Sequence, residues 1–310
     1  MHTILNTLDG AIPENTCSIM RDDLIPFSFG GNKVRKALLF SEEIDAGKFD
    51  YIVTYGSSTS NHCRVIANLA AQKALPCLII SPNEEAKDSF NHQLLELFGA
   101  EIVNCDVSDV KATIDTMLQR LCDNGYKPYF IPGGGHGNLG TKAYVQAYDE
   151  IRQYEATHNV FFEYIFLASG TGTTQAGLIC GKLLANDIDR KIVGISIARS
   201  NPRATQVIRD SILEYLEDID TNLVEESLLC VDDYICDGYG TYNQEISNLI
   251  LEVQRKYGIP LDPIYTGKAF WGMLEYCKEY HINDKNILFI HTGGAPLFFD
   301  FLKEREMNEI

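Results

Sequence analysis

The amino-acid sequence predicts an α/β protein with parallel sheets flanked by helices. Short runs of β-branched and aromatic residues alternate with helix-length amphipathic segments, which is the pattern of βαβ units. Glycine-rich segments follow several of these runs, where turns at the carboxyl ends of parallel strands are expected. A chain of 310 residues that is 45% hydrophobic can bury one large core or two moderate ones, and two lobes are usual at this length.

The order of these runs sets out the expected elements. Strands are expected over residues 51–55, 77–81, 101–105, 129–132, 164–168, 191–198 and 286–291. Helices are expected near residues 61–74, 88–98, 109–124, 138–157, 174–187, 202–218, 242–256 and 267–280. The chain contains no proline- or serine-rich linker and no internal repeat, so a second lobe must be inserted into the first.

Composition narrows the classes of partner. The chain carries 43 acidic against 26 basic residues, a formal charge of −17 at pH 7, which repels nucleic acid and anionic membranes. The nine cysteines form no C-x-x-C pair, which indicates reduced structural thiols and neither a disulfide framework nor a zinc site. The first residues lack a signal-peptide pattern, and no apolar run approaches the roughly 20 residues that span a bilayer. We expect a cytoplasmic protein that binds a small molecule and no metal.

Residues 169–177, Ser-Gly-Thr-Gly-Thr-Thr-Gln-Ala-Gly, follow an expected strand and open an expected helix. The glycines let the backbone approach a ligand, and the N–H groups of a helix start, together with threonine hydroxyls, favour an anion such as phosphate. The alternatives are a tight turn that binds nothing and a nucleotide site, but the P-loop pattern and the Gly-x-Gly-x-x-Gly spacing are both missing. The candidate ligand-binding residues are Gly170, Thr171, Gly172, Thr173 and Thr174.

Residues 30–36, Gly-Gly-Asn-Lys-Val-Arg-Lys, place two lysines three residues apart after a glycine pair. At a helix start, that spacing puts Lys33 and Lys36 on one face. A lysine becomes a Schiff-base nucleophile when it is desolvated or lies beside another cation, because both lower its pKa from about 10.4. Lys33 meets this requirement if Lys36 is near. The alternative is a solvated basic cluster that attracts anions without chemistry.

A few aromatic and imidazole side chains stand out by their position beside glycines. Tyr265 precedes an expected helix and Tyr239 lies between two glycines, whereas most tyrosines serve packing. His62 and His136 lie in glycine-rich loops and are candidate functional residues, although their spacing does not suit a metal. His291 ends a strand, and we predict a hydrogen-bonded structural histidine there, not a base.

Taken together, these segments resemble the D-cysteine desulfhydrase and 1-aminocyclopropane-1-carboxylate (ACC) deaminase family of pyridoxal-phosphate (PLP) enzymes. The resemblance covers nearly the whole chain. It rests on the ordered segments Arg21-Asp22-Asp23-Leu24, Gly31-Asn32-Lys33-x-Arg35-Lys36, Ser60-Asn61-His62-x-Arg64, Gly172-x-Thr174-x-Ala176-Gly177, Asp262-Pro263-x-Tyr265-Thr266-Gly267-Lys268 and His291-Thr292-Gly293-Gly294.

The resemblance implies the two-lobe fold of the tryptophan synthase β subunit, PLP fold type II. A smaller α/β lobe, residues 38–145, would be inserted into a larger PLP-binding lobe of residues 1–37 and 146–310. Family members are usually dimers, so the resemblance also implies a homodimer.

The resemblance further implies roles around the cofactor. Lys33 would hold PLP as a Schiff base, and Lys36 with the 170–174 loop would bind its phosphate. Asn61 would donate a hydrogen bond to the 3′-oxygen, and Tyr265 would stack near the pyridine ring. The implied cofactor-binding residues are Lys33, Lys36, Asn61, Gly170, Thr171, Gly172, Thr173, Thr174, Tyr265, Thr266 and Thr292.

For the substrate, a small amino acid, the resemblance implies that residues 60–62 receive the carboxylate. The freed Lys33 would then be the base for the α-proton. The implied substrate-binding residues are Ser60, Asn61, His62, His136, Tyr239 and Thr292, and the implied catalytic residues are Lys33, Tyr265, Tyr239 and Ser60.

Two threonines indicate the branch of the family. Thr266 would lie near the ring nitrogen, and a neutral hydroxyl there predicts an unprotonated nitrogen and a weaker electron sink, which favours expulsion of a β-substituent. ACC deaminases resemble one another in having Glu at the position of Thr266 and Leu at that of Thr292. The implied reaction is therefore β-elimination, as in D-cysteine desulfhydrase, releasing pyruvate, ammonia and sulfide, and ring opening of ACC is disfavoured.

The sequence departs from the family where the substrate would lie, at Thr59, at residues 65–66 and at residues 136–137. These departures leave open an anionic β-substituent, as in L-cysteate, and a β-replacement synthase on the same scaffold. They also leave open a homologue that binds PLP or an amino acid without turnover. The side chains that could accommodate a larger substituent are those of His62, His136 and Arg64.

Overall fold

The computed structural model describes residues 4–83 and 89–308, with side chains as far as residue 305. The first three residues of the chain and the start of the helix predicted near 88–98 lie outside the described residues. No helix in the described ranges combines the length and the apolar character that crossing a bilayer requires.

The chain divides into two compact units, a large one of residues 1–32 and 140–310 and a small one of residues 33–139. The sequence placed the lobe boundaries after residues 37 and 145, a few residues later in each case. The limits fall in the first turns of two helices, α1 (Asn32–Gly47) and α5 (Asn138–His158). A division of function between two domains stays a prediction.

Within the described residues, the large unit forms a six-stranded sheet in the order β1-β2-β10-β7-β8-β9. Only the β1–β2 pair is antiparallel among these neighbours. Continuous apolar runs such as Tyr164–Ser169 are buried, as expected for parallel strands covered on both faces. The strands are β1 (Leu5–Thr7), β2 (Thr16–Arg21), β7 (Tyr164–Ser169), β8 (Lys191–Ser196), β9 (Cys230–Val231) and β10 (Asn286–His291).

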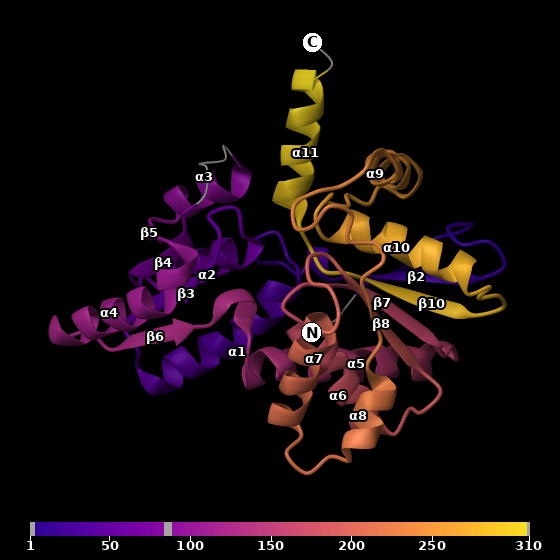
Figure 1. Ribbon diagram of the computed structural model, residues 1–310, viewed down its shortest axis with the longest axis horizontal. Coiled ribbons are helices and arrows are strands. Elements are labelled where there is room, and N and C mark those ends of the chain that lie inside the picture. Colours follow the sequence, from indigo (N-terminus) through magenta and orange to yellow (C-terminus); the bar gives the residue numbers. More distant parts are fainter. Residues whose placement is uncertain (1–3, 84–88, 309–310) are drawn as a thin grey trace. The chain divides into compact units, whose positions relative to one another are not determined.

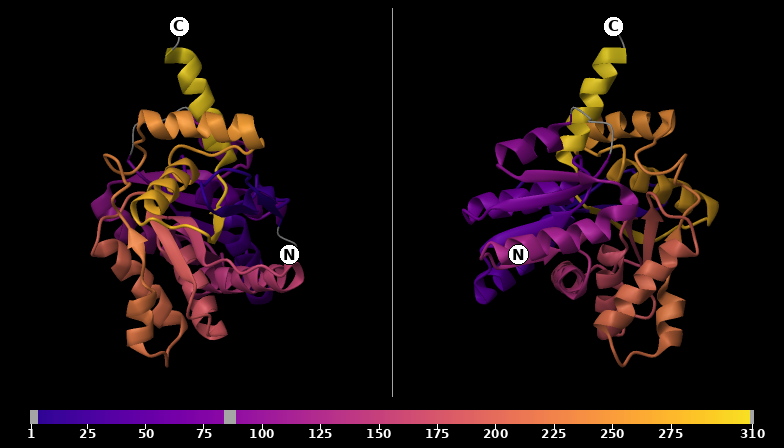
Figure 2. Two further views of the ribbon diagram at one scale, coloured as in Figure 1. Left: turned by 90° about the vertical axis from the view of Figure 1, so that its right-hand side faces the viewer. Right: turned by 60° about the vertical axis from the view of Figure 1, so that its left-hand side comes forward.

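Helices lie on both faces of this sheet, with α9 and α10 on one face and α5 to α8 on the other (Figure 1). On the first face, the Phe270 ring of α10 packs edge-on against Phe289 of β10, with 5.0 Å between ring centroids. On the other face, a Cβ at Gly177 of α6 would lie 2.4 Å from the Thr141 carbonyl oxygen of α5, so glycine permits this close packing. The remaining helices are α6 (Thr173–Ala185), α7 (Arg203–Tyr215), α8 (Thr221–Ser227), α9 (Gln244–Tyr257), α10 (Thr266–Glu279) and α11 (Ala295–Asn308), which projects from the large unit in Figures 1 and 2.

The small unit forms, in its described part, a four-stranded parallel sheet in the order β5-β4-β3-β6. Val53 and Ile80 are buried at its centre, where side chains of α4 such as Leu118 pack against them. Its elements are β3 (Tyr51–Tyr55), α2 (Asn61–Gln72), β4 (Cys77–Pro82), α3 (Phe90–Leu97), β5 (Glu101–Cys105), α4 (Val110–Asp123) and β6 (Pro128–Ile131), together with α1.

The predicted strands are all confirmed within one or two residues. The helix predicted over 202–218 ends at Tyr215, and the separate helix α8 follows it. Strands β1, β2 and β9 and helix α11 were not predicted from the sequence, which indicated the start of α1 but not its length. β2 reads Thr-Cys-Ser-Ile-Met-Arg, too short and mixed for a clear period, yet it lies in parallel register beside β10.

Candidate active site

The start of α1 follows a tightly packed glycine pair in the large unit. Gly30 and Gly31 have φ angles of +63° and +99°, and a Cβ on Gly31 would lie 2.7 Å from the Thr292 carbonyl oxygen. That same carbonyl accepts a hydrogen bond from the Asn32 N–H at 3.0 Å. Glycines are required because side chains fit neither the backbone angles nor the space. The residue preceding Lys33 is thereby fixed to the turn after β10.

Lys33 and Lys36 converge on one backbone oxygen inside the small unit. Their Nζ atoms donate to the Gly134 carbonyl at 3.1 Å and 3.3 Å. Lys36 is buried, and in the part of the chain that the structure describes neither amine has a carboxylate within ion-pair distance. Two amines therefore share one acceptor, and among the described residues each donates only this one of the three hydrogen bonds that an ammonium group can make.

Burial lowers the pKa of the Lys33 amine from its usual 10.5 to about 8. Burial and the adjacent Lys33 charge lower the pKa of Lys36 well below the same usual value. An amine whose pKa lies near neutrality is partly unprotonated in ordinary buffer and can attack a carbonyl carbon. The structure thus provides the desolvation that the sequence suggested for Lys33, and it places the Lys36 amine beside it on the same acceptor.

Ser60 and Asn61 open helix α2 in the small unit. The Ser60 hydroxyl accepts from the His62 N–H at 3.1 Å, as an N-cap residue does, which leaves its own hydrogen available to donate. The Asn61 Oδ1 accepts from the Asn91 Nδ2 at 3.0 Å. The same Asn91 nitrogen donates to the Thr59 carbonyl at 2.8 Å. Because its oxygen is engaged, Asn61 presents its Nδ2 hydrogens elsewhere.

The His62 ring faces the strands of its own unit. Thr54 donates its hydroxyl hydrogen to the Ile131 carbonyl at 2.7 Å, so the Thr54 oxygen accepts from the His62 Nε2 at 2.9 Å. Burial, with the charges of Lys33 and Lys36, lowers the pKa of His62 well below 6.5, so the ring is neutral.

The ring N–H and the backbone N–H of His62 are both engaged inside the fold. The expected hydrogen bond from His62 to a substrate carboxylate therefore finds no ready donor, unlike Ser60 and Asn61. His136, half-buried, follows the Gly133–Gly135 turn that carries the Gly134 carbonyl.

The predicted phosphate turn joins β7 to α6 in the large unit. Gly172, with φ +84°, precedes the first helical residue and provides no capping side chain. Arg199 donates to the Gly170 carbonyl, and Asn32 Nδ2 donates to the Thr174 hydroxyl oxygen at 3.0 Å. The turn is thus held from two sides while a helix start without a side-chain cap points its N–H groups outward, an arrangement that favours an anion.

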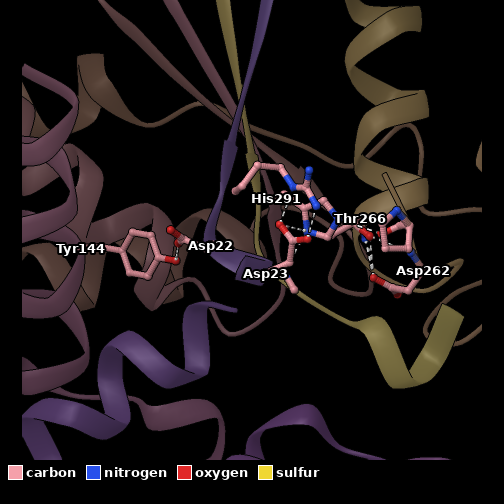
Figure 3. Close-up of polar contacts among 9 residues, drawn as sticks. Asp22, Asp23, Tyr144, Asp262, Thr266 and His291 are labelled. Carbon is pink, nitrogen blue, oxygen red and sulfur yellow. Dashed lines mark hydrogen bonds and ion pairs between the residues drawn. The ribbon is translucent and has the colours of Figure 1, made fainter. Parts of the chain in front are cut away.

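The start of α10 is built around the buried carboxylate of Asp262 (Figure 3). Its Oδ1 accepts from the N–H groups of Ile264 and Tyr265 at 3.0 Å and 2.7 Å. Its Oδ2 accepts from the Thr266 hydroxyl at 2.6 Å, and that hydroxyl in turn accepts from the Asp262 N–H at 2.8 Å. Burial raises the pKa of Asp262, whereas the hydrogen bonds from Thr266 and Tyr265 act in the opposite direction. With Asp262 ionised, Thr266 can offer another group a lone pair but no hydrogen.

His291 anchors the turn after β10, as Figure 3 shows. Its Nδ1 accepts from the Gly293 N–H at 3.2 Å, so its Nε2 carries the hydrogen and donates to the Pro260 carbonyl at 2.8 Å. Asp23 lies 3.5 Å from Nδ1 and already accepts two hydrogen bonds from Arg21. The prediction of a hydrogen-bonded structural histidine is confirmed. Thr292, which follows it, holds the Asn32 N–H through its carbonyl.

Tyr239 and Tyr265 meet within the large unit. Their hydroxyl oxygens are 2.6 Å apart and their rings pack edge to face with centroids 6.1 Å apart. Tyr265 precedes α10, and Tyr239 lies in the long connection after β9, so the predicted pair comes together from separate segments. Tyr239 remains 51% exposed, which keeps one side of this pair accessible.

Several residues that organise these groups had no distinctive signal in the sequence. Asn91 lies within an ordinary amphipathic helix, and Thr54 looks like any strand residue. The Gly134 carbonyl cannot be identified from residue type at all. Asp262 did carry a signal, since an Asp-Pro pair ahead of a helix often caps it, but that motif entered only as part of the resemblance.

Comparison with known proteins places this arrangement in context. The model of the family described as pyridoxal-phosphate dependent enzyme matches residues 4–293. A crystal structure of an ACC deaminase homologue is 30% identical, with a TM-score of 0.86, and the match covers 98% of this chain and 93% of that one.

More distant structures share the fold. A hydrogen sulfide-producing enzyme from Fusobacterium nucleatum is 21% identical with a TM-score of 0.67, over 94% of this chain and 95% of that one. Cysteine synthase from Entamoeba histolytica is 18% identical with a TM-score of 0.69, over 98% and 88%. The α/β fold is that of PLP fold type II enzymes, as predicted.

Proposed function

Because the chain belongs to the pyridoxal-phosphate-dependent enzyme family, we propose that it is a lyase that expels the β-substituent of a small amino acid. Lys33 is the observation that supports this proposal most directly. Its amine is enclosed and has a pKa lowered to about 8, and it hydrogen-bonds a carbonyl that it shares with a second lysine. That is the environment of a lysine that reacts with an aldehyde.

The described residues fit PLP. Two enclosed amines without acidic partners suit a ligand that carries both an aldehyde and a phosphate dianion, since the first consumes an amine and the second neutralises a cation. The uncapped start of α6, with Gly172 and buried Thr173 and Thr174, suits the phosphate oxygens. Following the resemblance, we assign Lys33 to attachment, and we assign Lys36 of the small unit and residues 170–174 of the large unit to the phosphate.

PLP, when bound, acidifies the α-proton of an attached amino acid by delocalising the negative charge left behind. The Lys33 amine, once released, accepts that proton at Nζ. The Ser60 hydroxyl and the Asn61 Nδ2 donate to the substrate carboxylate or to the cofactor oxygen; Ser60 is held by the His62 N–H of α2 and Asn61 by the Asn91 side chain of α3. The exposed side of the Tyr239–Tyr265 pair orients the leaving group or exchanges a proton with it.

Elimination and ring opening of ACC are the two reactions to separate. The similarity to an ACC deaminase homologue favours ring opening, whereas threonines at 266 and 292 favour elimination through the resemblance described above. The Thr266 hydrogen bond to Asp262 weakens one part of the second argument. A hydroxyl that only accepts suits a protonated ring nitrogen and does not require a weaker electron sink.

A substrate panel tests the proposal. The purified protein is loaded with PLP and supplied with D-cysteine, L-cysteine, L-cysteate, D-serine, β-chloroalanine and ACC, and keto acids are identified. We expect pyruvate from at least one β-substituted amino acid. 2-Oxobutanoate from ACC alone would replace elimination by ring opening, and no keto acid from any compound would leave a binding protein without turnover.

The cofactor assignment has its own control. Lys33→Ala should lose the visible absorbance of covalently held PLP and, with it, activity by more than about a thousandfold. Lys111→Ala, which removes an exposed lysine of α4 in the same unit, should change neither. A wild-type protein that stays colourless with PLP would refute the assignment.

A further inference from the structure

Lys268 is a buried lysine of the large unit that the proposed chemistry does not use. It lies in the first turn of α10, and its side chain is 0% exposed. Its Nζ donates to the carbonyl oxygens of Ile235 at 2.8 Å, Gly238 at 3.0 Å and Ile197 at 3.4 Å. An ammonium group has three hydrogens, so each has its own backbone acceptor.

The charge of Lys268 is held by dipoles, not by an ion pair. No carboxylate is recorded within ion-pair distance of it in the described residues, although Cys236 and the more distant Asp262 both act to raise its pKa. Burial lowers its pKa in spite of this. Backbone carbonyl oxygens are also the ligands of potassium ions in channel filters, so the place of the Lys268 Nζ suits a small monovalent cation. The Lys268 ammonium group therefore occupies the position that a small monovalent cation would take among these carbonyl oxygens.

The three carbonyls belong to segments that connect to the candidate site. Ile235 and Gly238 lie in the connection that carries Tyr239, where Cys236 and Gly238 have φ angles of +61° and +120°. The left-handed backbone angle of Cys236, which is not a glycine, needs support from outside the segment. At its far end, Tyr239 reaches Tyr265, three residues before Lys268. The connection is therefore tied to the start of α10 at two points.

The third carbonyl, that of Ile197, connects Lys268 to the strand end beside the predicted phosphate turn. Ile197 directly follows β8, and its N–H donates to the Ser169 carbonyl at 3.1 Å, at the end of β7. Two residues on, Arg199 donates to the Gly170 carbonyl and accepts from the Ser196 hydroxyl at 2.6 Å through its own carbonyl. One ammonium group thus joins the Tyr239 connection to the strand end beside residues 170–174.

We propose that Lys268 is a positioning residue whose ammonium group acts as a built-in monovalent cation, fixing residues 235–240 so that Tyr239 meets Tyr265 in the active site. The assignment of Tyr239 to the active site rests on the proposed function. The cation role itself does not, because it concerns the backbone of one segment.

Two substitutions with different side-chain volumes test the cation role. Lys268→Met fills the same space without charge, whereas Lys268→Ala leaves room for an added ion. Lys278→Met is the matched control, since Lys278 lies on the same helix with its side chain 80% exposed. Each protein is loaded with PLP, and amide hydrogen exchange of residues 235–240 is followed by mass spectrometry, together with kcat and KM.

Lys268→Met should exchange faster in residues 235–240 and show a KM raised about tenfold with a smaller loss of kcat, the size expected for losing hydrogen bonds to a charged group. Ammonium or potassium chloride should restore slow exchange in Lys268→Ala but not in Lys268→Met. Tetramethylammonium chloride, which is too large for the site, should restore neither.

Exchange and KM in Lys268→Met that match Lys278→Met would overturn the proposal, as would equal rescue by tetramethylammonium. If Lys268→Met does not fold, Lys268→Ala is purified in ammonium and dialysed into tetramethylammonium, and unchanged exchange overturns it equally. These exchange measurements need no turnover, so a failure of the proposed reaction would show only in the substrate panel.

Discussion

The starts of helices α1 and α10 each carry an enclosed lysine, and the two lysines have opposite surroundings. Lys268 at α10 donates to three carbonyls, and each of its hydrogens has an acceptor. Lys33 at α1 shares the single Gly134 carbonyl with Lys36. Burial lowers the pKa of both amines. For the roles we propose, burial is common to the reactive and the structural lysine, and the number of acceptors is what differs between them.

The largest expected effect comes from removing the second amine, Lys36, which lies beside Lys33 on the Gly134 carbonyl. Lys36→Met frees the Gly134 carbonyl for Lys33 and deletes the amine assigned to the cofactor phosphate. We expect PLP affinity to fall by tenfold to a hundredfold, from the roughly 1.5–3 kcal/mol of a hydrogen bond to a charged group. The measurement is a titration of the apoprotein followed by absorbance.

Lys111→Met provides the control for Lys36→Met, since it removes an exposed lysine of the same unit. If both variants bind PLP as the wild type does, Lys36 is a structural lysine. The contrast with Lys268 would then concern Lys33 alone, and not both lysines at the start of α1.

A second prediction concerns the pH at which Lys33 becomes a nucleophile. The neutral amine is the reactive form, and a pKa lowered to about 8 means that it forms at a lower pH than in an ordinary lysine. About one-tenth of Lys33 is neutral at pH 7, so the rate of covalent PLP attachment should rise about tenfold towards a plateau above pH 8. A stopped-flow pH series measures it, with a free alkylamine as reference. A midpoint near that of the free amine would mean that the amine is solvated.

Much of the fold could be predicted from the sequence. Parallel strands buried on both faces are continuous apolar runs, so β7 and β10 were evident, and the glycine-rich turns behind them followed. Strand β2 could not be recognised, because its place in the sheet depends on pairing with a strand more than 250 residues later.

In the candidate site, too, the sequence predicts some groups and not others. Residue type marked Lys33, with Lys36 near it, as suited to an aldehyde and the 170–174 turn as suited to a phosphate, whereas the phosphate role of Lys36 came from the resemblance. The acceptors that decide what those groups do are backbone carbonyls such as that of Gly134, which every residue possesses. The tautomer of His62 likewise depends on Thr54 passing its own hydrogen to Ile131, a three-membered chain that no local pattern encodes.

The smallest expected effect concerns Asn91, a neutral side chain whose donors, like those of Lys268, all have acceptors. Asn91 is 0% exposed, and its Nδ2 uses both hydrogens, on the Thr59 carbonyl and on the Asn61 Oδ1. If saturated donors mark supporting residues, Asn91 serves to orient the Asn61 amide. Asn91→Ala should then raise KM about threefold to tenfold, the cost of one neutral hydrogen bond, and leave kcat nearly unchanged. Gln93→Ala, on the exposed face of the same helix, should change neither KM nor kcat.

A double-mutant cycle decides whether Asn91 acts through Asn61. With Asn61 already replaced by alanine, there is no amide left to orient, so Asn91→Ala should add no further rise in KM. Additive effects of the two substitutions would show that Asn91 supports the loop through Thr59 or through packing alone. A side chain whose donors all have acceptors would then be identified as a supporting residue, but the group that it supports would not be known. Only Lys33 at α1 and Lys268 at α10 would still differ in their proposed functions.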